Sequence, residues 1–195
     1  MFEMPRFTRR TSPPQFNNYQ SYRPYLRQDF LKRCCYCGFR EIEGVEGFFH
    51  VEHFRPKKSF DHLACAYSNL YYSCAICNWT KSDTWPSDAE ILRGERFWDP
   101  CQDRSIDHFR CDSSSGEISH LSPCGQYTID EIDLDRPLLR QMRIKRIHRQ
   151  KRFREALIVL RNIREQLNPD SLSPNLRQVL VAQIQATLAD IRETL

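Results

Sequence analysis

The chain has 195 residues, of which 40% are hydrophobic, 12% aromatic and 28% charged, with a net charge of +4. This length suits one domain with a full core or a small domain with an appendage, and the composition excludes the polar, highly charged class of disordered chains. No apolar run approaches the ~20 residues that span a bilayer, and no apolar segment follows the charged start, so we expect a cytoplasmic protein without a membrane partner.

The first 30 residues contain four prolines among asparagine, glutamine, serine and tyrosine side chains: Pro5, Pro13, Pro14 and Pro24. Proline inside a helix or a sheet removes a backbone hydrogen bond, so this composition favours an extended segment. We therefore predict an N-terminal extended arm over residues 1–30, able to wrap on the core or on a partner.

Residues 31–93 concentrate cysteine, histidine and aromatic side chains, and we expect the chemistry of the protein in this module. Residues 47–54 are rich in β-favouring and aromatic side chains and precede Pro56, which predicts a strand or a hairpin arm. Residues 78–81 are predicted to open a short helix, and residues 87–93 to form a second one.

Residues 94–135 are predicted to form a small β-rich extension. Short strands are expected at residues 97–100, 108–111 and 116–119. The polar residues 112–116 end in a glycine and predict a hairpin turn between the last two strands.

Residues 136–195 are predicted to form a basic C-terminal helical region. Apolar residues recur at helical spacing after Asp135, a possible cap, and Pro137 suits the first turn. A break is expected at residues 168–170, followed by a second helix over residues 175–195. The excess of arginine and lysine in this region could lie along a DNA backbone, or could be a solvated face or pair with acids on a partner. Taken together, the elements predict the α+β class.

Two Cys-x-x-Cys pairs, Cys34 with Cys37 and Cys74 with Cys77, predict a structural zinc knot. Each pair forms a tight turn whose thiolates converge, and two turns supply the four tetrahedral ligands that Zn²⁺ requires. The total of nine cysteines is odd, which does not suit a secreted disulfide scaffold. The alternatives are ordinary buried cysteines or a redox motif, but a redox motif needs no second pair.

Three segments between and after the cysteine pairs resemble the signature of HNH (ββα-metal) endonucleases. Glu52-His53 precedes Pro56-Lys57, Asn69-Leu70 follows, and Cys77-Asn78 with Lys81 closes the pattern. The resemblance covers about residues 31–85. It implies a ββα-metal HNH core with the zinc knot, acting on DNA.

The residue chemistry agrees with this resemblance. His53 suits a general base because a neutral imidazole accepts a proton from water near pH 7. Glu52 and Asn78 offer hard oxygen atoms for a catalytic Mg²⁺ or Mn²⁺, and the longer Glu52 side chain in place of the usual aspartate suggests a larger cation such as Mn²⁺. The resemblance assigns Asn69 to bracing the loop and orienting His53. Neighbours on a strand face opposite sides, so Glu52 and His53 can share a site only where the strand ends or kinks.

Further basic and histidine side chains in this module have more than one possible role. Arg55, Lys57 and Lys81 are expected to contact DNA phosphates, as is Lys58, although a solvated surface lysine is the alternative for each lysine. His50 is a possible additional metal ligand, but a regular strand places it on the face opposite His53.

Short segments at residues 97–100, 116–118, 127–130 and 134–138 resemble, more weakly, the C-terminal part of HNH nucleases encoded with an ATPase in bacterial anti-phage (Septu-like) and retron-linked systems. This second resemblance implies a bacterial defence effector with an ATPase partner.

The sequence thus predicts a metal-dependent HNH endonuclease that hydrolyses DNA phosphodiester bonds. The alternatives are a zinc-stabilised nucleic-acid-binding module without catalysis and an RNA-directed nuclease. The combination of Glu52, His53 and Asn78 favours the endonuclease over the binding module, because binding alone needs no general base.

Overall fold

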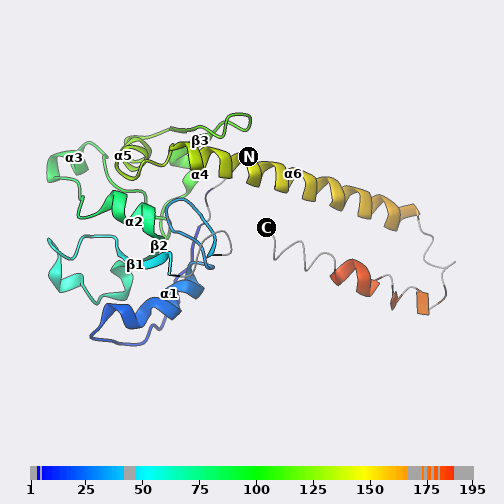
Figure 1. Ribbon diagram of the computed structural model, residues 1–195, viewed down its shortest axis with the longest axis horizontal. Coiled ribbons are helices and arrows are strands. Elements are labelled where there is room, and N and C mark those ends of the chain that lie inside the picture. Colours follow the sequence, from blue (N-terminus) through cyan, green and yellow to red (C-terminus); the bar gives the residue numbers. More distant parts are fainter. Residues whose placement is uncertain are drawn as a thin grey trace. The chain divides into compact units, whose positions relative to one another are not determined.

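The structure is a computed structural model that describes residue 4 and residues 6–41, 47–166, 173, 175–176, 178–179 and 181–186. The chain forms two compact units, Met1–Arg140 and Gln141–Leu195 (Figure 1). The described part of the first unit mixes helices with two small two-stranded antiparallel sheets.

The elements of the first unit follow one another in this order: η1 (Tyr19–Tyr22), α1 (Arg23–Asp29), β1 (Phe49–His53), η3 (Asp61–Leu63), η4 (Tyr67–Asn69), β2 (Leu70–Cys74), α2 (Ala75–Lys81), α3 (Asp88–Leu92), α4 (Ser105–His108), β3 (Phe109–Cys111), β4 (Ile118–His120) and α5 (Pro123–Ile132). The long helix α6 (Pro137–Gln166) begins in this unit and continues into the second.

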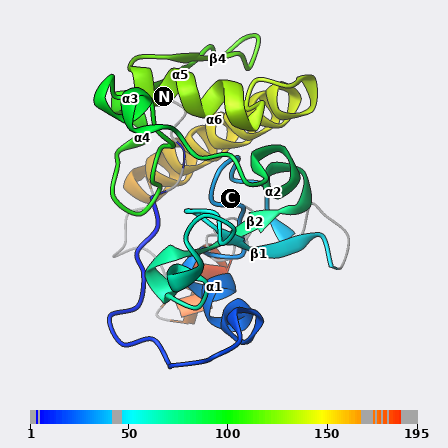
Figure 2. The same ribbon diagram turned by 90° about the vertical axis from the view of Figure 1, so that its left-hand side faces the viewer.

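The sheet that positions the candidate site pairs β1 with β2, in a register that places Phe49 opposite Cys74 and His53 opposite Leu70. All five residues of β2 are buried, so both of its faces pack against other parts of the unit. The strand passes directly into α2, with Cys74 as the N-cap residue. In both views the pair β1 and β2 lies between α1 on one side and α2 with α3 and α5 on the other (Figures 1 and 2).

The N-terminal segment differs from the predicted extended arm, because η1 and α1 occupy residues 19–29. Pro24 stands in the first turn of α1, where a missing N–H costs nothing. Tyr22, Leu26 and Phe30 recur at a spacing of four residues and are all buried. Phe30 contacts Tyr71 of β2 with ring centroids 5.4 Å apart, so this segment is part of the core. The prediction of an extended arm was wrong for residues 19–29.

The segment 94–135 is more helical than predicted. Strands form at β3 and β4, close to their expected places, but residues 97–100 are not a strand. The backbone N–H of Trp98 donates to the Thr128 hydroxyl at 2.7 Å instead of joining a ladder. Helix α5 accounts for much of this segment. It begins after the N-cap residue Ser122, and Pro123 stands in its first turn. That signal was available in the sequence, and the description as β-rich is corrected.

Other helices agree with the sequence. Ser87 caps α3 in a capping box with Glu90, and α6 begins at Pro137 as predicted. Helix α2 begins at Ala75, three residues before the expected start. Of the predicted helix 175–195, residues 175–176, 178–179 and 181–186 are helical, and the rest lies outside the described residues. Within the described part of the chain, no helix has the length and apolar character needed to cross a membrane.

Candidate active site and metal centre

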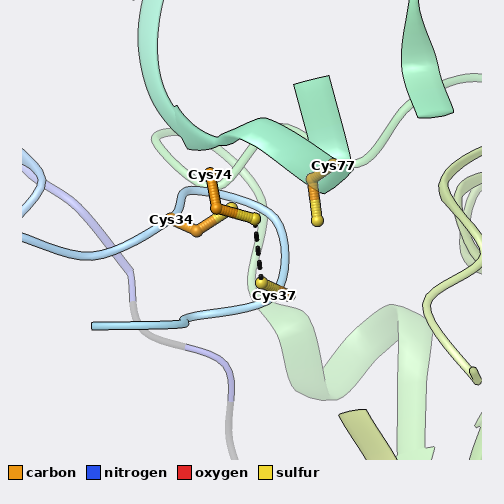
Figure 3. A group of neighbouring side chains, drawn as sticks. All are labelled: Cys34, Cys37, Cys74 and Cys77. Carbon is orange, nitrogen blue, oxygen red and sulfur yellow. Dashed lines mark hydrogen bonds between the residues drawn. The ribbon is translucent and has the colours of Figure 1, made fainter. Parts of the chain in front are cut away.

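The two cysteine pairs meet in one buried cluster, as predicted. The Sγ atoms of Cys34, Cys37, Cys74 and Cys77 all lie within 4.8 Å of one another (Figure 3). The Sγ atoms of Cys37 and Cys74 are 3.8 Å apart. A tetrahedral zinc ion with Zn–S bonds of about 2.3 Å separates its sulfur ligands by about 3.8 Å. The donor set therefore fits a structural Zn²⁺.

Local backbone geometry explains why the four thiols converge. The first pair sits in a turn in which the Gly38 N–H donates to the Cys34 carbonyl, and Gly38 has a φ of +68° that suits glycine. In the second pair, Cys74 ends β2 and Cys77 lies in the first turn of α2. The turn and the strand-to-helix junction thus each contribute two of the four thiols. Cys35 is buried nearby but is not part of the cluster.

Glu52 forms a buried ion pair with Lys81. The Lys81 Nζ lies 2.8 Å from Glu52 Oε1, and the exposed fractions of the two side chains are 0% and 3%. Lys81 also donates to the His53 carbonyl at 3.1 Å, and the Tyr36 hydroxyl donates to Glu52 Oε1 at 3.4 Å. Burial raises the pKa of Glu52 to about 7, against the opposing effects of Lys81 and Tyr36.

The prediction that Lys81 contacts DNA phosphates is corrected by this geometry. A lysine with no exposed surface is unable to reach a phosphate at the protein surface, and its ammonium is already held by a carboxylate and a carbonyl. Lys81 instead fixes the position of Glu52 and of the end of β1.

We predict that Lys81→Met lowers the free energy of unfolding by about 3–5 kcal/mol, because it leaves the Glu52 carboxylate buried without its counter-charge. Urea unfolding followed by circular dichroism measures this change. Arg93→Met is the matched control, since it removes the cation of an exposed pair with Glu95, and we expect little change from it. Equal effects of the two variants would contradict the importance of the buried pair.

Glu52 and Asn78 both line a cavity of about 280 Å³ that His53 also lines. The contacts of Glu52 with protein groups both fall on Oε1, which leaves Oε2 without a protein partner among the described residues. The Asn78 side-chain amide likewise has no hydrogen-bond partner in the described part of the chain. Two oxygen donors without protein partners on one polar cavity fit a divalent cation such as Mg²⁺ or Mn²⁺.

The ring of His53 is held by one hydrogen bond and one aromatic contact. His53 Nε2 lies 3.0 Å from the Ala64 carbonyl oxygen, which only accepts hydrogen bonds, so Nε2 carries the proton and Nδ1 is left to accept one. The Tyr19 ring meets the imidazole edge to face, with centroids 4.7 Å apart. Burial lowers the pKa of His53, and the positive charges of Lys57 and Lys81 lower it further, against the effect of the Ala64 hydrogen bond. The imidazole is therefore neutral near pH 7.

The adjacent residues Glu52 and His53 line the same cavity because β1 ends at His53. Strand alternation no longer separates their side chains at that point. His50 lines this cavity as well, although regular alternation places it opposite His53.

Asn69 holds the loop that follows β1. Its Oδ1 accepts from the Arg55 N–H at 2.9 Å, and its Nδ2 donates to the carbonyls of Arg55 at 3.0 Å and Leu63 at 3.4 Å. Leu63 adjoins Ala64, whose carbonyl contacts His53. These are the contacts that a bracing residue would make.

The remaining basic residues of the predicted site are exposed. Arg55 lies over the rings of Phe60 and Trp85, at 5.6 Å and 5.5 Å from their centroids. Lys57 lines the cavity, with its Nζ 5.1 Å from the Tyr19 ring centroid. Lys57 is therefore accessible to a ligand that enters the cavity, whereas Arg55 is exposed directly before Pro56, which lines it.

The sequence did not predict that Tyr19 and Tyr36 lie at the site. Tyr19 belongs to a segment predicted to be an arm and lies 34 positions before His53, so no local spacing connects the two. Tyr36 lies inside the first cysteine pair, where only its neighbours suggested a role. For Lys81 the sequence did contain a signal, because a position three residues after Asn78 lies on the same face of a helix.

The sequence is similar to two curated proteins of Bacillus mycoides (strain KBAB4). The first, Septu protein PtuA, is 27% identical over 146 residues, which cover 61% of this chain and 20% of PtuA. The second, Septu protein PtuB, is 30% identical over 166 residues, which cover 71% of this chain and 55% of PtuB. The chain thus spans a fifth of the length of one relative and about half of the other. No protein-family model matches the chain.

Proposed function

We propose that this chain is a metal-dependent HNH endonuclease that hydrolyses DNA phosphodiester bonds. One observation carries the proposal: a single polar cavity combines His53, with Nδ1 open to accept a proton, and two oxygen donors without protein partners, on Glu52 and Asn78. The antiparallel pair of β1 and β2, followed directly by α2, supports a ββα-metal core.

In the proposed reaction His53 Nδ1 accepts a proton from the attacking water. The Nε2–H bond to Ala64 fixes the ring, and Asn69 braces the loop that carries that carbonyl group. Because the imidazole is neutral near pH 7, it can act as a base without first having to release a proton. Lys81 and Tyr36 orient the Glu52 carboxylate by holding Oε1.

Glu52 Oε2 and the Asn78 amide oxygen are the groups that would hold Mg²⁺ or Mn²⁺. The bound cation supplies stabilisation of the negative charge that develops on the phosphate and the leaving oxygen. Lys57 is exposed and lines the cavity, and Arg55 is exposed two positions before it in the chain, so both are suited to contacting phosphates beside the cleaved bond.

We further propose that the chain acts in bacterial anti-phage defence together with an ATPase partner. The support is the similarity to PtuA and to PtuB, two proteins that carry the Septu name in one organism. The weaker resemblance of the segments after residue 96 to nucleases encoded with an ATPase points the same way.

The catalytic cation provides the test of this site. We predict that the purified chain cleaves supercoiled plasmid only when Mg²⁺ or Mn²⁺ is added, and that Asn78→Ala needs a higher concentration of the cation for half-maximal rate, by about 10-fold or more. The cation is omitted for the blank, because a chelator would also remove zinc. Cleavage that is equally fast without added cation would contradict the assignment of Glu52 and Asn78.

The same assay separates the alternative functions. Retention of the plasmid in a gel-shift experiment without any cleavage supports the zinc-stabilised binding module. Cleavage of RNA in preference to plasmid supports the RNA-directed nuclease.

A further inference from the structure

One cationic side chain reaches the four-cysteine centre from outside the two cysteine-bearing segments. Arg136 Nη2 donates to the Cys77 Sγ at 3.3 Å, across 59 positions of sequence. Arg136 lies directly before α6 and is separated from the cysteines by the whole segment that contains α3, α4 and α5.

The rest of the guanidinium is held by the end of α5. Arg136 Nη1 donates to the carbonyls of Ile132 at 3.0 Å and Asp133 at 2.8 Å. Asp133, with a φ of +50°, is the C-cap residue of α5. The two carbonyls fix the plane of the guanidinium so that Nη2 faces the sulfur, which distinguishes this contact from the chance approach of a flexible surface arginine.

The charges around Arg136 also single out the thiolates. Within the described part of the chain Arg136 forms no ion pair with a carboxylate. The neighbouring acid Asp135 accepts a hydrogen bond from the Ile118 N–H and pairs with Arg140. Arg136 Nε is buried without a hydrogen-bond partner. A partly buried guanidinium in this position needs a nearby negative charge, and the cysteine cluster supplies it.

The zinc centre in turn needs a positive charge. A zinc ion with four thiolates carries a net charge of −2, and these four sulfur atoms are buried. Burial penalises such a charge unless a cation or hydrogen-bond donors offset it. Donors to the ligands of a metal typically change its affinity by 10- to 100-fold.

We propose that Arg136 is the charge-compensating partner of the zinc-bound Cys77 thiolate. It stabilises the thiolate form of Cys77, slows the loss of zinc and ties the end of α5 to the zinc knot. The proposal depends on the zinc centre and not on nuclease activity, and the test below contains no cleavage step.

The test compares three variants of the full chain. Arg136→Met keeps most of the apolar stem and removes the charge, and Arg136→Lys keeps a charge but loses the planar donor group. Arg140→Met is the matched control, because Arg140 lies one turn further along the chain and pairs with Asp135. The first readout is the rate of zinc transfer to a chromogenic chelator. The second is the thiolate-to-metal charge-transfer band of the Co²⁺-substituted protein, which reports the electron density on sulfur.

We expect Arg136→Met to lose zinc about 10-fold faster than the wild type or more, and its charge-transfer band to shift to lower energy. Arg136→Lys should fall between the two, and Arg140→Met should match the wild type. If Arg136→Met does not fold, the test rests on the differences in charge-transfer band energy and in rate of zinc loss between the wild type and Arg136→Lys.

Two outcomes would overturn the proposal. Lower stability of the Arg136 variants with an unchanged band and an unchanged rate of zinc loss would mean that Arg136 only caps α5. A wild-type chain that binds neither Zn²⁺ nor Co²⁺ would remove the zinc centre itself.

Discussion

Cys74→Ser is expected to prevent the first unit from folding stably. The change removes one of the four cysteines that we expect to bind zinc, and structural zinc sites contribute roughly 10–16 kcal/mol of apparent binding free energy near pH 7. The total stability of a domain is of the order of 5–15 kcal/mol, so the loss of a large part of this term exceeds what the rest of the core can supply. Cys74 also lies at the junction of β2 and α2, which carry the residues of the candidate site.

The measurements for this variant are thermal unfolding by circular dichroism and zinc content by native mass spectrometry. The wild type should hold one zinc ion per chain, and the Cys74→Ser variant should hold less than one. The thermal unfolding curve of the variant should show no cooperative transition. Cys111→Ser serves as the control, because Cys111 is half-buried and lies outside the cluster. A Cys74→Ser chain that unfolds at the temperature of the wild type would contradict the structural role of zinc.

His53→Ala is expected to lower the rate of DNA cleavage by about 10²- to 10⁴-fold, the usual contribution of a general base. The effect on folding should be small, because the half-buried ring makes one hydrogen bond, to Ala64, and one aromatic contact, with Tyr19. The initial rate of plasmid cleavage at saturating cation gives the ratio to the wild type, and thermal unfolding confirms that the variant is folded.

The control for this variant is His62→Ala. The His62 side chain is 70% exposed and does not line the cavity, so its removal should leave cleavage and folding unchanged. If His53→Ala cleaves DNA as fast as His62→Ala, His53 is not the base.

The features that the sequence predicted best are those with short spacing. The two-residue spacing brings Cys34 near Cys37 in a turn and Cys74 near Cys77 at the start of α2, and only the meeting of the two pairs needed the fold. The short helix α3 and the start of α6 agree with the predictions, and both carry local signals, a serine cap in α3 and a proline in the first turn of α6.

The features that the sequence missed depend on contacts between distant segments. The helix α1 was hidden by a high proline content, and its buried face is defined by β2, about 45 residues further on. The burial of Lys81 could not be read from its charge, because lysine is normally exposed and only its pairing with Glu52 permits the buried position. Arg136 was counted only as part of a basic helical region. Its contact with sulfur was missed because Cys77 lies 59 positions away in the sequence.

The most direct measurement of the central claim is the conversion of supercoiled plasmid by the zinc-loaded wild-type chain in the presence of Mn²⁺ or Mg²⁺. The assay is run alone and with the proteins encoded beside it, and an RNA of matching sequence is incubated in parallel. We predict cation-dependent nicking or linearisation of the DNA. Plasmid that is bound but stays supercoiled under every one of these conditions would contradict it.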